Sequence, residues 1–225
     1  MLDFVKNNFV HVAPILLCAG FAVAIMFERW ITLYFRYSMS GRAQFFDKVR
    51  QLVLSGRIAE AVTFCDRYPS QPVAKVVKEA LLRTQMPEEV IAHGLEITVS
   101  ELQQQVQSRT PFLATIANVA TLLGLFGTIL GLIHSFEAIG NASAQQRSAL
   151  LAAGISTAMN ATMMGLAVAI PCMVVFSIFA SKTNQINAEI EQSATRMLDI
   201  IKQYFYSFSE VEARDQKSDF RRRVA

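Results

Sequence analysis

Three long runs of the sequence contain no lysine, arginine, aspartate or glutamate, and they constrain the fold more than any other feature. The runs are residues 9–27, 112–136 and 149–181. Even the shortest, with 19 residues, would form a helix about 28 Å long, close to the ~30 Å thickness of the hydrocarbon core of a bilayer. The sequence therefore predicts an all-α membrane protein with three transmembrane helices.

The second and third runs are joined by a short polar connector, residues 137–148, so they are expected to form a hairpin. The third run is longer than one bilayer thickness and should tilt or protrude. Pro171 lies inside it, and membrane helices tolerate proline where neighbouring groups satisfy the freed carbonyl. The first run has no basic segment before it and no small-residue cleavage site after it, so we expect it to be retained.

The positive charges predict the orientation of the spans. Residues 36–110 hold ten lysines and arginines and residues 182–225 hold eight, whereas the connector and the first eight residues hold one each. Loops rich in lysine and arginine stay in the cytoplasm. We therefore expect a periplasmic N-terminus and connector, and a cytoplasmic loop and C-terminus.

The remaining segments are predicted to be helical. Apolar residues recur at steps of three and four in residues 36–110 and again from Asn184, as they do in amphipathic helices. The expected breaks are the Ser-Gly-Arg sequence at 55–57 and prolines 69, 72 and 87. The predicted organisation is an N-terminal periplasmic end and first transmembrane helix (1–35), a cytoplasmic helical domain (36–110), a transmembrane hairpin (111–181), and a cytoplasmic helix with a polar tail (182–225).

Several functional classes find no support in the sequence. The net charge is only +3 and no basic patch is interleaved with aromatic residues, so we expect no nucleic-acid partner. Cys18, Cys65 and Cys172 lack the paired spacing of a disulfide framework or a metal site. The chain also lacks the P-loop, HExxH, GxSxG and CxxC motifs. We therefore expect neither an enzyme nor a bound cofactor or metal.

The spans contain polar residues but no acid, so this chain alone has no carboxylate relay at membrane depth. The hydroxyls could bond to their own helix carbonyls, or hold helices together. Because polar stripes occur on two neighbouring helices, the sequence favours a shared polar path. The residues concerned are Thr115, Asn118, Thr121 and Thr128 in the second run, and Ser156, Thr157, Asn160 and Thr162 in the third.

Small residues accompany the polar ones. Glycine lets membrane helices approach closely, because packing is a main driving force for their association in lipid. The predicted helix-packing positions are Gly124, Gly127, Gly131 and Gly165.

The segments ATLLGLFGTILGLIHSF at 120–136 and GISTAMNATMMGLAVAIP at 154–171 resemble the MotA/TolQ/ExbB proton-channel family. The Glu-Arg-Trp set at 28–30 and the order of spans resemble its ExbB/TolQ-like branch. By this resemblance, Thr128 and Thr162 match the threonines of the family's pore. Thr157 stands where ExbB and TolQ have a glutamate, which indicates a divergent member.

The resemblance implies a ring-forming subunit, a homopentamer, in a motor of the bacterial inner membrane. Two copies of a single-span partner similar to ExbD or TolR would stand inside the ring, and the partner's membrane Asp would carry the proton. Ser156, Thr157 and Asn160 are then expected to join Thr128 and Thr162 along the ion pathway. The motor would use the proton-motive force for energised transport, envelope maintenance or gliding motility. A non-conducting membrane scaffold is the alternative.

Overall fold

A computed structural model describes residues 9–37, 41–140, 143 and 145–224, with side chains described only between 13 and 206. Every regular element in these ranges is helical, which confirms the predicted all-α fold. The first eight residues, predicted to be periplasmic, and the side chains of the polar tail lie outside the described part. The elements are α2 (Phe9–Ile31), the π-helix η1 (Thr32–Arg36), α3 (Arg42–Leu54), α4 (Ile58–Cys65), α5 (Pro72–Leu82), α6 (Glu88–Gln107), α7 (Thr110–Gly140) and α8 (Arg147–Val224).

Three stretches of helix are long and apolar enough to cross a membrane. They contain the second and third predicted runs in full and the first run from Ala13 onward. Helix α7 continues four residues beyond the second run, to Gly140, and α8 begins at Arg147. Backbone hydrogen bonding in a helix does not stop where the apolar residues stop, so the connector between the helices is shorter than the polar segment of the sequence.

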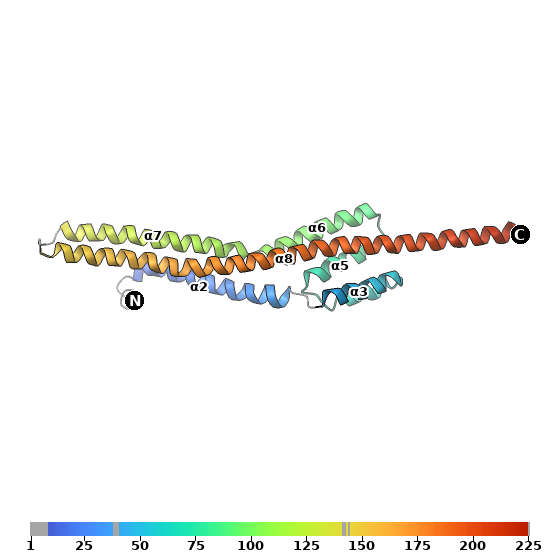
Figure 1. Cartoon of the computed structure of the whole chain (residues 1–225), viewed down its shortest axis with the longest axis horizontal. Helices are drawn as coiled ribbons and strands as arrows, with labels where there is room; N and C mark the ends of the chain where they lie inside the picture. The colour runs from blue at the N-terminus through green and yellow to red at the C-terminus, as the bar shows by residue number, and fades with distance from the viewer. Residues whose placement is uncertain (1–8, 38–40, 141–142, 144, 225) are drawn as a thin grey trace. The chain divides into compact units, whose positions relative to one another are not determined.

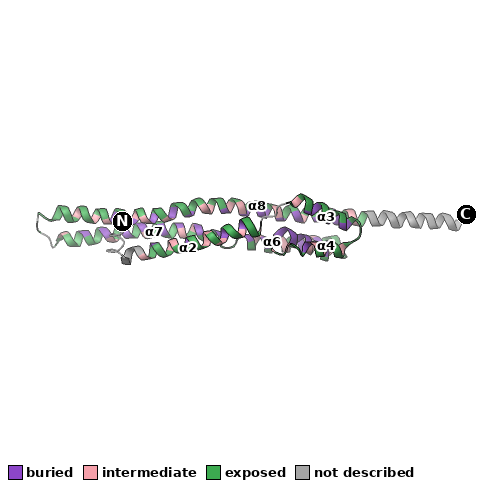
Figure 2. Ribbon diagram, turned by 90° about the horizontal axis from the view of Figure 1, so that it is seen from below, coloured by how far each residue is buried: buried purple, intermediate pink, exposed green. Residues whose placement is uncertain are grey.

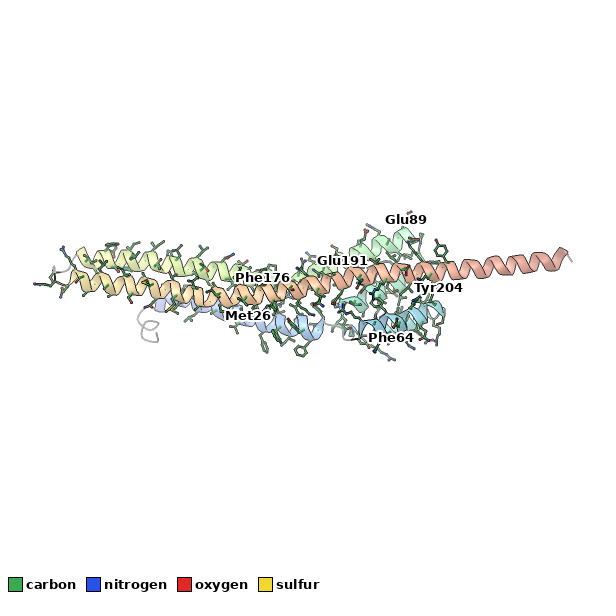
Figure 3. The ribbon with its side chains drawn as sticks, viewed as in Figure 1. Met26, Phe64, Glu89, Phe176, Glu191 and Tyr204 are labelled. Carbon is green, nitrogen blue, oxygen red and sulfur yellow. The ribbon has the colours of Figure 1, made fainter. Side chains whose placement is uncertain are left out.

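Contacts within the chain define two compact units. The first, here called the apolar unit, comprises residues 1–32 and 107–182. It contains α2, α7 and the first part of α8, and α7 and α8 run side by side from their short connector (Figure 1). Their direction is antiparallel, as a hairpin requires. The packed centre consists of small buried residues from all three helices, namely Ala22, Ala117, Ala120, Ala169 and Cys172, with Met26 (labelled in Figure 3), Ile116 and Val168 against them.

A polar junction within the apolar unit fastens the end of α2 to the start of α7. Arg29 is only 2% exposed, and its Nη2 donates to the Ser108 hydroxyl at 2.9 Å. One Arg109 guanidinium nitrogen lies 2.6 Å from a carboxylate oxygen of Glu28. Arg109 itself has a left-handed backbone with φ of 66°, a conformation that costs a non-glycine residue about 1 kcal/mol. These contacts hold the short segment between α6 and α7 against the end of α2.

The second unit, here called the polar unit, comprises residues 33–106 and 183–225. Its helices α3 to α6 and the later part of α8 enclose an aliphatic core. The Ser-Gly-Arg break is confirmed as a helix end: Gly56 has φ of 74°, and the amides of Gly56 and Arg57 donate to the carbonyls of Val53 and Leu52. This is the Schellman arrangement, which satisfies the last carbonyls of a helix. Core residues that are fully buried include Val49, Val53, Val76, Val77, Ile91 and Ile190.

Aromatic and polar contacts complete the polar unit. The ring of Phe64 (Figure 3) stacks on that of Phe45 at 5.5 Å between centroids. Gln103 donates to Glu191 at 2.6 Å, joining α6 to α8. Cys65 is buried, and burial raises the pKa of its thiol to about 12, so it packs as a small apolar group rather than as a thiolate.

Candidate functional site in the helix hairpin

The closest approach between α7 and α8 occurs at glycines. A Cβ atom added to Gly127 would lie 2.7 Å from the Cβ of Ala161. One added to Gly165 would lie 2.7 Å from the Ala120 carbonyl oxygen, and one added to Gly124 would lie 3.2 Å from the Gly165 Cα. No side chain larger than hydrogen fits these separations without movement of the helices. The two backbones therefore touch, as small residues permit in lipid.

The same contact line continues toward the connector. Gly131 lies against Ala158, with 3.2 Å between its added Cβ and the Ala158 Cα. One turn further, Ser135 occupies the space at Gly154, and its hydroxyl donates to the Gly131 carbonyl at 2.6 Å. Ser135 is buried and was not among the predicted positions. Its spacing of four from Gly131 was the available signal.

One predicted pathway residue connects the two helices directly. The Thr162 hydroxyl, on α8, donates to the carbonyl oxygen of Gly124 on α7 at 3.3 Å. This bond is long, so its contribution to helix association is small; interhelical hydrogen bonds in membranes average about 0.6 kcal/mol. The Thr162 hydroxyl oxygen keeps its lone pairs, so it can still accept a hydrogen bond.

The other threonines bond within their own helices. Thr128 donates to the Leu125 carbonyl at 2.6 Å and Thr157 to the Ala153 carbonyl at 3.0 Å. Thr121 and Thr115 do the same on α7, toward the carbonyls four residues earlier. In each case the hydroxyl hydrogen is already donated to a carbonyl, and the hydroxyl oxygen can still accept a hydrogen bond. The back-bonding foreseen from the sequence therefore occurs, and it leaves an acceptor on each residue.

The contact register brings several predicted pathway residues to one level of the hairpin. Gly127 faces Ala161 and Gly131 faces Ala158. Because the helices are antiparallel, Thr128, the residue after Gly127, is level with Asn160, the residue before Ala161. Thr157, the residue before Ala158, lies within one residue of the level of Gly131. Asn160 and Thr157 are half-buried and Ser156 is exposed. Thr162 lies one step further along α8, beside Gly124.

Polar residues of the hairpin also lie beside the contact line, on surfaces that this chain leaves open. The buried stripe of α7 consists of small residues, among them Ala117, Gly124 and Gly131. Asn118 and Thr121 lie outside this stripe and are exposed, as is Leu125. Figure 2 shows much of the hairpin as exposed. The polar residues are therefore available to another chain.

The electrostatics of the hairpin are neutral. The runs at 112–136 and 149–181 contain no charged residue. Among the described residues, no group of histidine, cysteine and acidic side chains could hold a metal ion. What the hairpin offers chemically is a set of hydroxyls and amides that can accept or donate hydrogen bonds beside a tightly packed backbone.

Fold and site together define a polytopic helical membrane protein with an uncharged polar hairpin. The sequence profile of the MotA/TolQ/ExbB proton channel family matches residues 68–192, which is more than half of the chain. The chain therefore belongs to this family, as predicted.

Individual relatives agree with this assignment. The chain is 29% identical over 205 residues to a biopolymer transport protein ExbB of Pseudomonas putida, covering 87% of this chain and 61% of that protein. It is 34% identical over 106 residues to the Tol-Pal system protein TolQ of Haemophilus influenzae, covering 46% of each. It is 36% identical over 105 residues to an ExbB of Salmonella typhimurium, covering 46% of this chain and 42% of that protein. The chain thus spans less than two thirds of the length of these relatives.

Proposed function

We propose that this chain is the ring-forming subunit of a motor in a bacterial inner membrane, and that the motor is driven by the proton-motive force. The observation that carries the proposal is the polar hairpin. Hydroxyls and amides line two touching helices, and no lysine, arginine, aspartate or glutamate lies in the same spans. Such a surface suits a proton path whose titrating group comes from another chain.

Exposure of the polar residues supports assembly into a ring. A polar group facing lipid without a partner costs several kcal/mol, because the hydrocarbon offers no hydrogen bonds. Asn118 and Thr121 are exposed in the single chain. The Thr121 hydroxyl donates to the Ala117 carbonyl, but its oxygen can still accept a hydrogen bond. Copies of the chain arranged around a common bore, with the pentamer implied by the resemblance, would turn these residues away from lipid.

A partner acid completes the chemistry. The pKa of a carboxyl group buried in an apolar bore is strongly raised, so the group would stay neutral and hold its proton. Hydroxyls beside it stabilise the ionised form by hydrogen bonding and allow the proton to leave. We assign this role to Thr128 and Thr162, with Asn160, Thr157 and Ser156 close by in the register. The partner is a single-span protein, similar to ExbD or TolR, with one aspartate at membrane depth.

The orientation follows from the distribution of charge. We place the loop at 36–110 and the segment at 182–225 in the cytoplasm, and the N-terminus and the 137–148 connector in the periplasm. The relatives' names concern biopolymer transport and the Tol-Pal system, so an envelope process powered from the inner membrane is the proposed output.

A non-conducting scaffold is the second candidate, and one observation favours it. Four of the threonines donate to carbonyls of their own helices. If these bonds are their whole purpose, removing the hydroxyls should have little effect on function.

Valine substitutions separate the two candidates. Valine keeps the branched shape of threonine and removes only the hydroxyl, so Thr128→Val and Thr162→Val should leave assembly intact and abolish proton flux. Flux is measured with a pH-sensitive dye in proteoliposomes that hold the chain and its partner. Thr115→Val, which makes the same change nearer the cytoplasmic end, is the matched control and should be mild. Normal proton flux in the double valine variant would exclude the proposed proton path and leave the non-conducting scaffold as the remaining candidate.

A further inference from the structure

A basic hollow lies in the polar unit, between η1 and the turn that precedes α5. Its volume is about 530 Å³, and its walls are Phe35, Arg36 and residues 67–71. Among the residues that the structure describes, no acidic side chain lines it. The hollow therefore combines two guanidinium groups, those of Arg36 and Arg67, with an aromatic ring and the polar side chains of a turn.

Both arginines are exposed, and in the described part of the chain neither forms an ion pair. The nearest acid in the sequence, Asp66, is engaged elsewhere, since its carboxylate lies 2.6 Å from the Lys78 ammonium. This contact raises the pKa of Lys78. Helix α5 begins at Pro72, directly after the turn, and the N-terminal end of a helix adds partial positive charge. The potential in the hollow favours an anion.

The position of the hollow identifies the source of the anion. Arg36 is the last residue of the helical stretch Ala13–Arg36, which is long and apolar enough to cross a bilayer, and it lies nine residues beyond the end of the first apolar run. Phe35 is 76% exposed, and exposed aromatic rings are enriched at the membrane–water interface, at the level of the headgroups. A bilayer holds phosphate groups at this level, whereas a free anion is not held there.

We propose that this hollow binds the headgroup phosphate of an anionic phospholipid. The guanidinium groups of Arg36 and Arg67 donate to the phosphate oxygens, as arginine does in fork-like pairs. The Phe35 ring lies beside the headgroup. The site requires only that the first helix crosses the membrane, so it does not depend on ion conduction.

Lipid binding to the purified full-length chain tests the site. Native mass spectrometry in neutral detergent compares dioleoylphosphatidylglycerol with dioleoylphosphatidylcholine. A basic residue near a membrane surface favours binding to anionic lipid. The contributions of two such residues together correspond to a preference of about thirtyfold for phosphatidylglycerol over phosphatidylcholine. Arg36→Gln with Arg67→Gln should remove this preference and leave the binding of phosphatidylcholine unchanged.

Control variants distinguish an effect of this site from an effect of the protein's total charge. Lys48→Gln with Arg57→Gln removes the same charge from exposed positions of the polar unit and should keep the preference. Arg36→Lys with Arg67→Lys should keep most of it. Circular dichroism checks that each variant is folded. The proposal is overturned if the Arg36 and Arg67 glutamine variant keeps its preference, if the control loses as much, or if millimolar inorganic phosphate displaces the lipid.

Discussion

At Gly165, an added methyl group would meet the backbone of the neighbouring helix. Its added Cβ would lie 2.7 Å from the Ala120 carbonyl oxygen and 2.9 Å from the Gly124 Cα. Backbone atoms cannot rotate aside as a flexible side chain can, so the helices themselves must separate. Gly20 on α2 has no such neighbour within 4 Å. The two glycines therefore differ in packing while sharing the same conformational freedom.

We predict that Gly165→Ala destabilises the protein relative to Gly20→Ala by about 1–3 kcal/mol, the usual cost of overpacking. Both substitutions gain the same intrinsic helix propensity, so the difference reports packing alone. Thermal unfolding in detergent, followed by the fluorescence of Trp30, measures it. Equal midpoints for the two variants would show that the close approach of the helices is absent.

For single residues, packing positions could be predicted from the sequence, but hydrogen-bond partners could not. Gly127 and Gly165 were predictable as packing positions, because small residues let membrane helices approach closely. The partners of the hydroxyls were not predictable. Whether Thr162 bonds across to α7 or back to its own helix depends on its side-chain rotamer and on the register, and neither is encoded by spacing alone.

At the scale of elements, the junction between α2 and the start of α7 depends on one buried and one exposed arginine. Arg29 is 2% exposed and bonded to Ser108, whereas the Arg109–Glu28 pair is largely open to solvent. A hydrogen bond to a buried charged group contributes about 1.5–3 kcal/mol. An exposed ion pair contributes at most about 1 kcal/mol.

Arg29→Ala should therefore lower the free energy of unfolding by about 2 kcal/mol or more, and Glu28→Gln by no more than about 1 kcal/mol. Arg29→Met, which keeps most of the apolar stem, separates lost packing from the lost hydrogen bond. Denaturant titration in mixed micelles gives the values. A larger loss of unfolding free energy for Glu28→Gln than for Arg29→Ala would contradict the conclusion that Arg29 is the buried member of this junction.

Element boundaries were predictable where local chemistry dictates them. Pro72 begins α5 and Pro87 precedes α6, because proline fits the first turn of a helix. The left-handed conformation of Arg109 was not predictable, since arginine has no preference for that region. The contacts of Glu28 and Arg29 with residues about 80 positions later impose it, and a pattern within one segment carries no information about such contacts.

For the whole molecule, the proposed orientation makes a direct prediction about accessibility. In a background without the native cysteines, Ser143→Cys should react with a membrane-impermeant thiol reagent in intact cells whose outer membrane has been made permeable. Ser70→Cys should react only after lysis. The physical reason is the excess of lysine and arginine in the loop that carries Ser70, which resists translocation. The reverse labelling pattern would exclude the proposed topology.

The central claim is that the polar hairpin is completed by other chains, which bring an acid to its hydroxyls. Imaging of the complex purified with its single-span partner, at a resolution that shows side chains, tests this claim most directly. The expected result is a closed ring in which α7 and α8 line the bore, with a partner aspartate beside Thr128 and Thr162. A monomer, or a ring whose Thr128 and Thr162 face lipid with no acid at their level, would contradict it.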